Sequence, residues 1–228
     1  MIRLSERQIQ HIQTTLQLED GDLVKAGLVD GKIGAIRLHK STSGSIHGTF
    51  DETSWDTSAV PSALPCRLIL ALSRPKMLRR IFQMVASIGI KQIAIVNSYR
   101  VEKSFWSSPL LRPESIREQL ILGLEQGIDT TLPEVTLYNR FKPFVEDILP
   151  SWSDESMRLV AHPYDSISCP AQVTEPVTLA IGPEGGFIPY EVEKFVESGF
   201  RPVSLGTRIF RVETAVPLVV GRLFPVSS

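Results

Sequence analysis

Apolar residues follow two different spacings along this chain, and the spacing changes near residue 60. Before that point they alternate with polar residues in short segments. Residues 23–29 and 32–38 are two such segments, and Asp30-Gly31 between them is a dipeptide typical of a tight β-turn. The first 50 residues are therefore predicted to form a small β-rich unit with one short opening helix.

A polar stretch punctuated by proline, residues 49–65, predicts a linker, and continuous apolar runs alternating with helical patterns follow it. Strands are predicted at residues 66–72, 90–96, 134–138, 157–162, 177–181 and 202–205, and helices at 75–88, 113–126, 141–149, 189–198 and 213–224. Strand and helix in regular alternation predict an α/β fold with a parallel sheet. The predicted domains are residues 1–60, linker included, and residues 61–228.

Two glycine-containing loops each follow a predicted strand near the end of the chain. The first is Gly182-Pro183-Glu184-Gly185-Gly186-Phe187, and the second begins at Leu205-Gly206. Successive strand-loop-helix units are expected to place both loops side by side at the carboxyl edge of the sheet, where open α/β sheets bind ligands. Pro183 removes an N–H donor and Glu184 adds negative charge, so a neutral or cationic ligand suits the first loop better than a phosphate. Glycines that only turn the chain tightly are the alternative.

Composition and charge narrow the class of protein. Of 228 residues, 43% are hydrophobic and 21% are charged, which is typical of a globular protein. The chain has no apolar run of transmembrane length and no signal-peptide core, so it is predicted to be cytoplasmic and free of membrane. A net charge of −1 means that any RNA contact must come from a local basic patch. Cys66 and Cys169 lack metal-ligand spacing and are expected to be buried, reduced thiols; no metal site is predicted.

The two loops also carry a long, ordered motif. It comprises residues 182–187, a following Glu-Val helix, and Leu205-Gly206-x-Arg208-Ile209-x-Arg211-x-Glu213-Thr214-Ala215. In these residues the chain resembles the 16S ribosomal RNA uracil N3-methyltransferases of the SPOUT superfamily, and the resemblance extends more thinly over nearly the whole chain. It implies a SPOUT-type sheet with a C-terminal trefoil knot, a PUA-like β-barrel that helps to hold RNA in the first 60 residues, and a homodimer that binds S-adenosylmethionine. The implied substrate is 16S ribosomal RNA within the small ribosomal subunit.

The resemblance and the chemistry together nominate site residues. The implied cofactor-binding set is Ile181, Gly182, Pro183, Glu184, Gly186, Leu205, Gly206, Ile209, Arg211, Thr214 and Ala215. Methyl transfer to N3 of uracil needs a cation to stabilise negative charge on the base, and Arg211 is preferred to Arg208 for this role. Glu184 and Glu213 are candidates to accept the proton or to hold an arginine in place, although Glu213 could serve only the helix dipole. Arg211 could instead form a surface or dimer salt bridge. His162, at a strand end facing the same edge, could line the adenosine pocket or be structural.

Other positions depart from the family pattern or are expected in the core. Gln17, Met84, Ser87 and Asp129 stand where the family carries charged residues, whereas Ser98 and Arg100 match it. Phe187, Phe210 and Leu218 are expected in the core. In the first domain Lys25, Lys32, Arg37, His39 and Lys40 could form a modest basic face or, equally, an ordinary solvated surface dotted with charge. The departures leave two alternatives: a paralogue that methylates another RNA, and a non-catalytic RNA-binding protein that retains the fold.

Overall fold

The computed structural model describes residues 2–41, 45–56 and 58–224, and the chain forms two compact units. Unit 1 consists of Met1–Pro61 together with Ile128–Thr131, and unit 2 consists of Ser62–Gly127 together with Leu132–Ser228. Each unit has its own apolar core. Across the described residues, no helix has the length and apolar character needed to cross a membrane.

Unit 1 contains an antiparallel sheet in the order β1 (Ile2–Arg3), β4 (Ile46–Phe50), β3 (Ile33–Lys40) and β2 (Leu23–Gly27). The predicted hairpin is confirmed, since β2 pairs with β3 in antiparallel register. The opening helix α1 (Glu6–His11) begins at Ser5 in a capping box with Gln8 and continues as a π-helical turn, η1 (Ile12–Leu16). One end of the predicted linker is wrong, because β4 continues to Phe50 by pairing with β3. A short 3-10 turn, η2 (Glu52–Ser54), follows β4, and position 57 of the linker lies outside the described residues.

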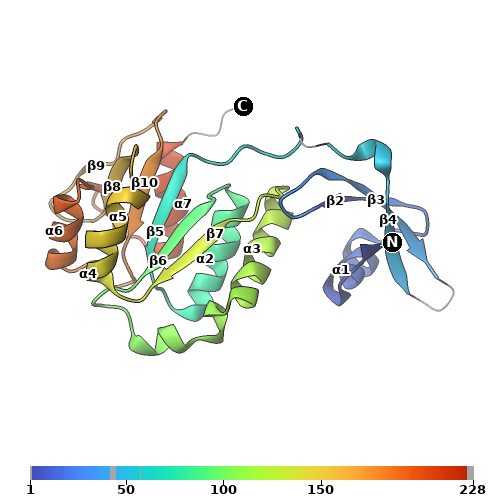
Figure 1. Ribbon diagram of the computed structural model, residues 1–228, viewed down its shortest axis with the longest axis horizontal. Helices are drawn as coiled ribbons and strands as arrows, with labels where there is room; N and C mark the ends of the chain where they lie inside the picture. Colours follow the sequence, from blue (N-terminus) through green and yellow to red (C-terminus); the bar gives the residue numbers. More distant parts are fainter. Residues whose placement is uncertain (1, 42–44, 57, 225–228) are drawn as a thin grey trace. The chain divides into compact units, whose positions relative to one another are not determined.

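Unit 2 is an α/β domain, as its alternating pattern predicts, with a sheet in the order β7-β6-β5-β10-β8-β11-β9 (Figure 1). Its strands are β5 (Cys66–Ala71), β6 (Gln92–Val96), β7 (Glu134–Tyr138), β8 (Met157–Ala161), β9 (Ile167–Ser168), β10 (Val177–Ile181) and β11 (Arg201–Ser204). Every pairing in this sheet is parallel. The central strands are buried on both faces, which explains their continuous apolar runs.

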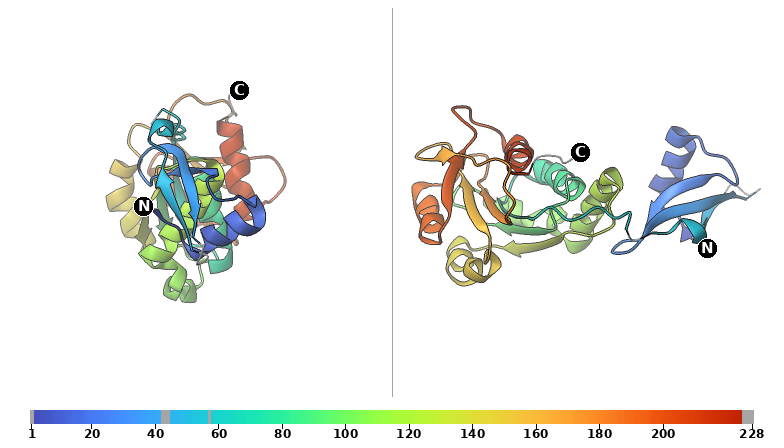
Figure 2. Two further views of the ribbon diagram at one scale, coloured as in Figure 1. Left: turned by 90° about the vertical axis from the view of Figure 1, so that its right-hand side faces the viewer. Right: turned by 90° about the horizontal axis from the view of Figure 1, so that it is seen from above.

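Helices cover both faces of the unit 2 sheet (Figure 2). They are α2 (Pro75–Ser87), α3 (Pro113–Gly127), α4 (Phe141–Pro143), α5 (Leu149–Trp152), α6 (Pro189–Glu197) and α7 (Val212–Leu223), with turns η3 (Lys103–Ser107), η4 (Pro109–Leu111) and π-helical η5 (Phe144–Ile148). Helices α2, α3 and α7 lie on one face. Helices α4, α5 and α6 lie on the other, where the rings of Phe141 and Phe195 pack edge to face with centroids 5.5 Å apart.

Two features of unit 2 depart from the sequence prediction. The helix expected at residues 141–149 is three short segments, α4, η5 and α5, with a wider π-helical turn in the middle. Strand β9 was not predicted, because its two residues are too few to show a period. The remaining predicted strands and helices of this unit are confirmed with ends shifted by one or two residues.

Candidate active site

The two glycine loops lie at the carboxyl edge of the unit 2 sheet and are separated by one strand. Strand β8 pairs with β10 on one side and with β11 on the other, so Ile181, Ala161 and Val203 stand in register. The prediction that the loops are direct neighbours is therefore wrong, because the crossover through α6 passes over β8. Two strand spacings place the starts of the loops about 10 Å apart. His162, the residue after β8, lies between them.

The first loop is held on both sides by neighbouring loops. The N–H of Gly186 donates to the carbonyl of Pro183 at 2.7 Å and closes a tight turn, for which Gly186 adopts a φ of +73°. The carboxylate of Glu184 accepts from the backbone N–H of Arg74 at 3.2 Å, and the guanidinium of Arg100 donates to the carbonyl of Gly185. These bonds connect the loop to the segments that follow β5 and β6, so its position is fixed by the protein.

A buried carboxylate on α6 completes this arrangement. Glu191 is 2% exposed and accepts hydrogen bonds from the Ser98 hydroxyl at 3.0 Å, the Tyr99 N–H at 2.8 Å and the Ile188 N–H at 3.0 Å. One carboxylate therefore joins the start of α6, directly after the first loop, to the segment after β6. A single Glu in the first turn of a helix carries no sequence signal of burial, so this carboxylate could not be singled out from the sequence.

The second loop, between β11 and α7, is open to solvent. Gly206 has a φ of +105°, and a Cβ atom added there would meet no protein atom within 4 Å; the same is true of Gly186 in the first loop. Both loops therefore turn glycines toward unfilled space at the same sheet edge. Arg208 is exposed, and Ile209 is 72% exposed.

Helix α7 begins directly after the second loop and positions the remaining predicted site residues. Arg211 is the N-cap residue, and its carbonyl accepts from the N–H groups of Thr214 and Ala215 at 2.9 and 2.8 Å. Its side chain is exposed and makes no capping bond, so the guanidinium is available to a ligand. Glu213 is half-buried in the first turn of the helix.

The predicted residues differ in how much of the side chain can reach a ligand. Ile181 is 3% exposed and belongs to the core, so only its backbone can contribute to a site. Phe187 is 3% exposed and lies in the core as expected, whereas Phe210 is only half-buried. The expectation for Leu218 is wrong, because it is 44% exposed on the outer side of α7. The apolar period of a helix does not distinguish a core face from a face that a partner covers.

Electrostatics around His162 favour its neutral form. Burial lowers the pKa of His162, Asp165 opposes this by attraction for the cation, and the Arg100 guanidinium lowers the pKa further. The Tyr164 ring packs edge to face against the imidazole, with centroids 5.9 Å apart. The lowered pKa favours the neutral imidazole of His162, which follows β8 between the strands that carry the two loops.

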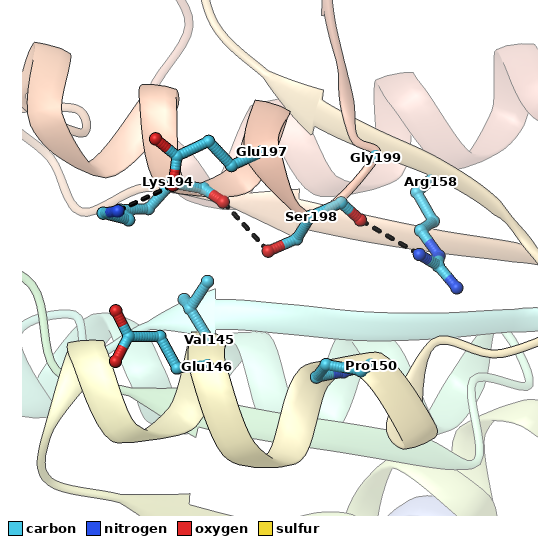
Figure 3. Close-up of a pocket in the computed structure, with 8 residues that line it drawn as sticks. All are labelled: Val145, Glu146, Pro150, Arg158, Lys194, Glu197, Ser198 and Gly199. Atoms are coloured by element: carbon cyan, nitrogen blue, oxygen red, sulfur yellow. Dashed lines mark hydrogen bonds and ion pairs between the residues drawn. The ribbon is translucent and has the colours of Figure 1, made fainter.

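A hollow of about 570 Å³ lies elsewhere in unit 2, between η5, α5 and the last turn of α6 (Figure 3). Arg158 lies on its wall and donates to the carbonyls of Ser153 and Ser198 at 3.1 and 3.0 Å. Lys194 is paired with Glu197 at 2.6 Å. Arg158 and Lys194, the two basic side chains that line the hollow, thus already have partners. None of the predicted site residues lines it. Arg158 is the second residue of β8, so this hollow belongs to the amino edge of the sheet, opposite the loops.

The positions that departed from the family pattern have structural roles here. Met84 packs against the core, and the Ser87 hydroxyl donates to the Met84 carbonyl at 2.8 Å. Asp129, 9% exposed, accepts from the Thr131 N–H at 2.9 Å. Gln17 ends η1 in the left-handed conformation with a φ of 51°.

The expected basic face of unit 1 is not a single face. Side chains alternate along β3, so Lys40 lies on the side of Leu38 and away from Arg37 and His39. Lys40 is also paired with Glu19 at 2.8 Å, and Arg37 donates to the Gly21 carbonyl at 2.7 Å.

Two remaining expectations concern thiols and metals. Both cysteines are buried and free, as expected. Burial raises the pKa of Cys66 to about 12, and burial also raises the pKa of Cys169. No group of three or more His, Cys, Asp or Glu side chains within the described residues is placed to hold a metal ion.

Comparison with known proteins agrees with this geometry. Residues 60–223 match a family model described as an RNA methyltransferase domain. The ribosomal RNA small subunit methyltransferase E of Treponema pallidum is 31% identical over 209 residues, covering 90% of this chain and 77% of that protein. A relative in Borreliella burgdorferi, ribosomal RNA small subunit methyltransferase E 1, is 25% identical and covers 94% of this chain and 88% of its own.

Solved structures share the fold. A ribosomal RNA small subunit methyltransferase E from Neisseria gonorrhoeae, bound to S-adenosylmethionine, superposes with a TM-score of 0.75 at 23% identity, covering 96% of this chain and 88% of that one. A methyltransferase from Legionella pneumophila with the same cofactor gives a TM-score of 0.72. An α/β domain that matches an RNA methyltransferase domain over most of its length places the chain in the class of RNA methyltransferases. Within that class, the chain belongs to the ribosomal RNA small subunit methyltransferase E family.

Proposed function

We propose that this chain is an S-adenosylmethionine-dependent methyltransferase that methylates N3 of a uridine in 16S ribosomal RNA. One observation carries the proposal: two loops flank β8 at the carboxyl edge of the sheet, and each turns a glycine, Gly186 or Gly206, toward space that no protein atom fills. Membership of the family indicates that the substrate is the RNA of the small ribosomal subunit.

The residues of the two loops fit the proposed cofactor. When bound, S-adenosylmethionine would supply a methyl group activated by its sulfonium cation. Glu184 places a carboxylate on the first loop, which suits a cation and disfavours a nucleotide phosphate. The rest of the cofactor pocket would be lined by backbone groups of the two loops and by the start of α7: Gly182, Pro183, Leu205 and Ile209, with Thr214 and Ala215.

The polar residues around the loops have separate proposed roles in the reaction. N3 of uracil must lose its proton as it gains the methyl group, and negative charge then develops on the base oxygens. Arg211, whose guanidinium is exposed, would stabilise that charge, with Arg208 as the second candidate. Glu213 would accept the proton or orient Arg211. Adjustment of the second loop against the fixed first loop would align both substrates and exclude water.

The wider assembly is also part of the proposal. Two exposed apolar side chains favour a homodimer that buries them: Ile209, at 72% just before α7, and Leu218, at 44% in the middle of α7. The Cys169 carbonyl accepts from Arg222 at 2.7 Å, and the Val173 N–H donates to the Leu223 carbonyl at 2.8 Å, so the segment before β10 lies against α7. That contact supports a trefoil knot formed by the two loops and α7. Unit 1 would act as a PUA-like RNA-holding domain, and the enzyme would act in the cytoplasm on the small ribosomal subunit.

The experiment pairs calorimetric titration of S-adenosylmethionine with methyl transfer to small ribosomal subunits from a strain that lacks the gene. We expect binding and the appearance of 3-methyluridine in 16S RNA. Absence of cofactor binding at millimolar concentration would contradict the enzyme proposal and favour a non-catalytic RNA-binding protein. Binding without transfer to 16S RNA would favour a paralogue with another RNA target, which the uncharged Met84 and Ser87 also suggest.

A further inference from the structure

Three basic side chains form a stripe on the outer surface of α2. Lys76, Arg79 and Arg80 are spaced by three and four residues, so they share one side of the helix, and all three are exposed. We call these residues the α2 basic stripe. It spans about 6 Å along the helix axis at the usual rise per residue.

The positive charge of this stripe is not neutralised by neighbouring carboxylates. In residues 2–41, 45–56 and 58–224, no ion pair involves any of the three side chains. The first turn of α2 also lacks an acidic residue, so the positive end of the helix dipole adds to the field. Unpaired cations side by side repel one another, and in a chain of net charge −1 their concentration at one place indicates an anionic partner.

The stripe lies close to the proposed active site. Helix α2 starts at the carboxyl edge of the sheet after β5, and the backbone N–H of Arg74, its N-cap residue, donates to Glu184 of the first loop. Lys76 is only two residues further along. An extended anionic molecule bound beside the first loop could therefore also contact the stripe.

The remainder of the same helix side is covered by protein. Gln83 donates to Gln119 of α3 at 2.7 Å, and the Ser87 backbone lies against Gly127 of α3. The stripe is thus the part of α2 that α3 leaves open. The family carries charged residues at the positions of Met84 and Ser87. In this chain those positions are uncharged, and the basic residues of the α2 basic stripe lie one to two helical turns closer to the loops.

We infer that the α2 basic stripe is a docking surface for the phosphate backbone of the RNA that carries the target uridine. Arg and Lys neutralise phosphates and so fix an RNA in register without reading its sequence, which suits a surface beside a site that must receive one particular base. The inference rests on the proposed function for the identity of the RNA.

The test is the double variant Arg79→Gln/Arg80→Gln. Binding of a 16S RNA transcript is measured by fluorescence anisotropy from 50 to 300 mM KCl, alongside steady-state methyl transfer. If both arginines bind phosphates, the slope of log affinity against log salt falls by about 2, or about 1 for each phosphate that is no longer neutralised. We also expect KM for RNA to rise several-fold and by more than kcat changes, with the affinity for S-adenosylmethionine at the parent value.

The matched control is Lys194→Gln/Arg201→Gln, which removes the same charge at the amino edge of the sheet, where α6 ends and β11 begins. It should leave the salt slope and KM unchanged. A parent-like slope and KM in the Arg79/Arg80 variant would overturn the inference, as would equal losses in the control. Loss of binding to vesicles with 30% anionic lipid, with RNA affinity intact, would assign the stripe to lipid and also overturn it.

Failure of this inference is distinguishable from failure of the proposed function. RNA binding is measured without cofactor, so it responds to the stripe whether or not methyl transfer occurs. A chain that transfers no methyl group to 16S RNA but loses RNA affinity in the double variant would refute the function and keep the surface. A chain that methylates 16S RNA but keeps its RNA affinity and salt slope in the double variant would keep the function and refute the surface.

Discussion

The two loops of the proposed active site differ in how firmly the protein holds them. The first is fixed by Arg74 and Arg100, and Glu191 anchors the helix that follows it. The second has no such support, since within the described part of the chain no hydrogen bond involves residues 205–210. A fixed loop can present a preformed surface to a cofactor, whereas a free loop can adjust to a second substrate. We therefore propose that the first loop fixes the position of the cofactor, whereas the second loop contacts the cofactor and also presents the residues that act on the base.

Removing the guanidinium of the second loop should have the largest effect. In Arg211→Ala we expect kcat to fall by about 10²- to 10³-fold, because a cation beside the base stabilises charge that develops only in the transition state. The dissociation constant for S-adenosylmethionine should change little, since Arg211 makes no capping bond whose loss would disturb α7. Single-turnover kinetics and calorimetry measure the two quantities. Equal losses in rate and cofactor affinity would show that Arg211 binds rather than catalyses, and a larger loss in Arg208→Ala would exchange the two roles.

Filling the space above the second loop should weaken cofactor binding by the next largest amount. Gly206→Val puts a branched side chain where no atom of this chain lies within 4 Å, so it disturbs no internal contact and acts on whatever binds at the loop. Gly21→Val is the matched control, because Gly21 has a comparable φ of +87° and is also free of neighbours, but it lies in unit 1. Both variants should lose about 1–2 kcal/mol of stability from left-handed backbone strain. Calorimetry should detect weaker S-adenosylmethionine binding in the Gly206 variant alone; unchanged affinity there would remove the second loop from the site.

Loosening the anchor of the first loop should have an intermediate effect. In Glu191→Gln an amide NH₂ replaces one acceptor oxygen and faces either the Tyr99 N–H or the Ile188 N–H, so at least one bond is lost. We expect the free energy of unfolding to fall by about 2 kcal/mol, the usual cost of losing a hydrogen bond to a buried charged group. Cofactor affinity should fall as well, while kcat at saturating cofactor is retained. Glu193→Gln, exposed on the same helix, is the control, and a rate defect without an affinity defect would argue against an anchoring role.

The smallest expected effect is on the titration of His162 between the loops. Its pKa is lowered in the folded protein, chiefly by burial, so its contribution to stability is present above its ordinary value of 6.5 and is lost as the pH falls through the folded pKa. NMR titration should give a midpoint below 6.5. Asp165→Asn should lower the midpoint further and Arg100→Gln should raise it. A midpoint at or above 6.5 would mean that the imidazole is solvated and does not lie between the loops as described.

The sequence predicts most of the strands and helices of unit 2, and the physical reason is burial. A strand such as β10, buried at every position, favours an almost continuous apolar run. Helix α6 begins at Pro189, whose fixed φ suits a first helical turn, and ends before Gly199, which adopts a φ of +83°. Short elements such as β9 carry no period and could not be predicted.

The arrangement of the site is less predictable than its location. Local pattern places both loops at the carboxyl edge, but strand order depends on long-range pairing. The insertion of β8 between them, and the position of half-buried His162 there, are therefore known only from the fold. The burial of Glu191 depends on contacts more than 90 residues away in the chain, with Ser98 and Tyr99. A carboxylate bound by donors from another loop looks the same in sequence as one exposed to solvent.

The central claim, methylation at N3, is tested most directly by mass-spectrometric nucleoside analysis of 16S ribosomal RNA from the parent strain and from one that lacks this gene. The account predicts that 3-methyluridine disappears without the gene, returns when the parent chain is restored, and stays absent when Arg211→Ala is supplied at the same level. Persistence of 3-methyluridine in the strain without the gene would contradict the account, because another enzyme would then make that modification.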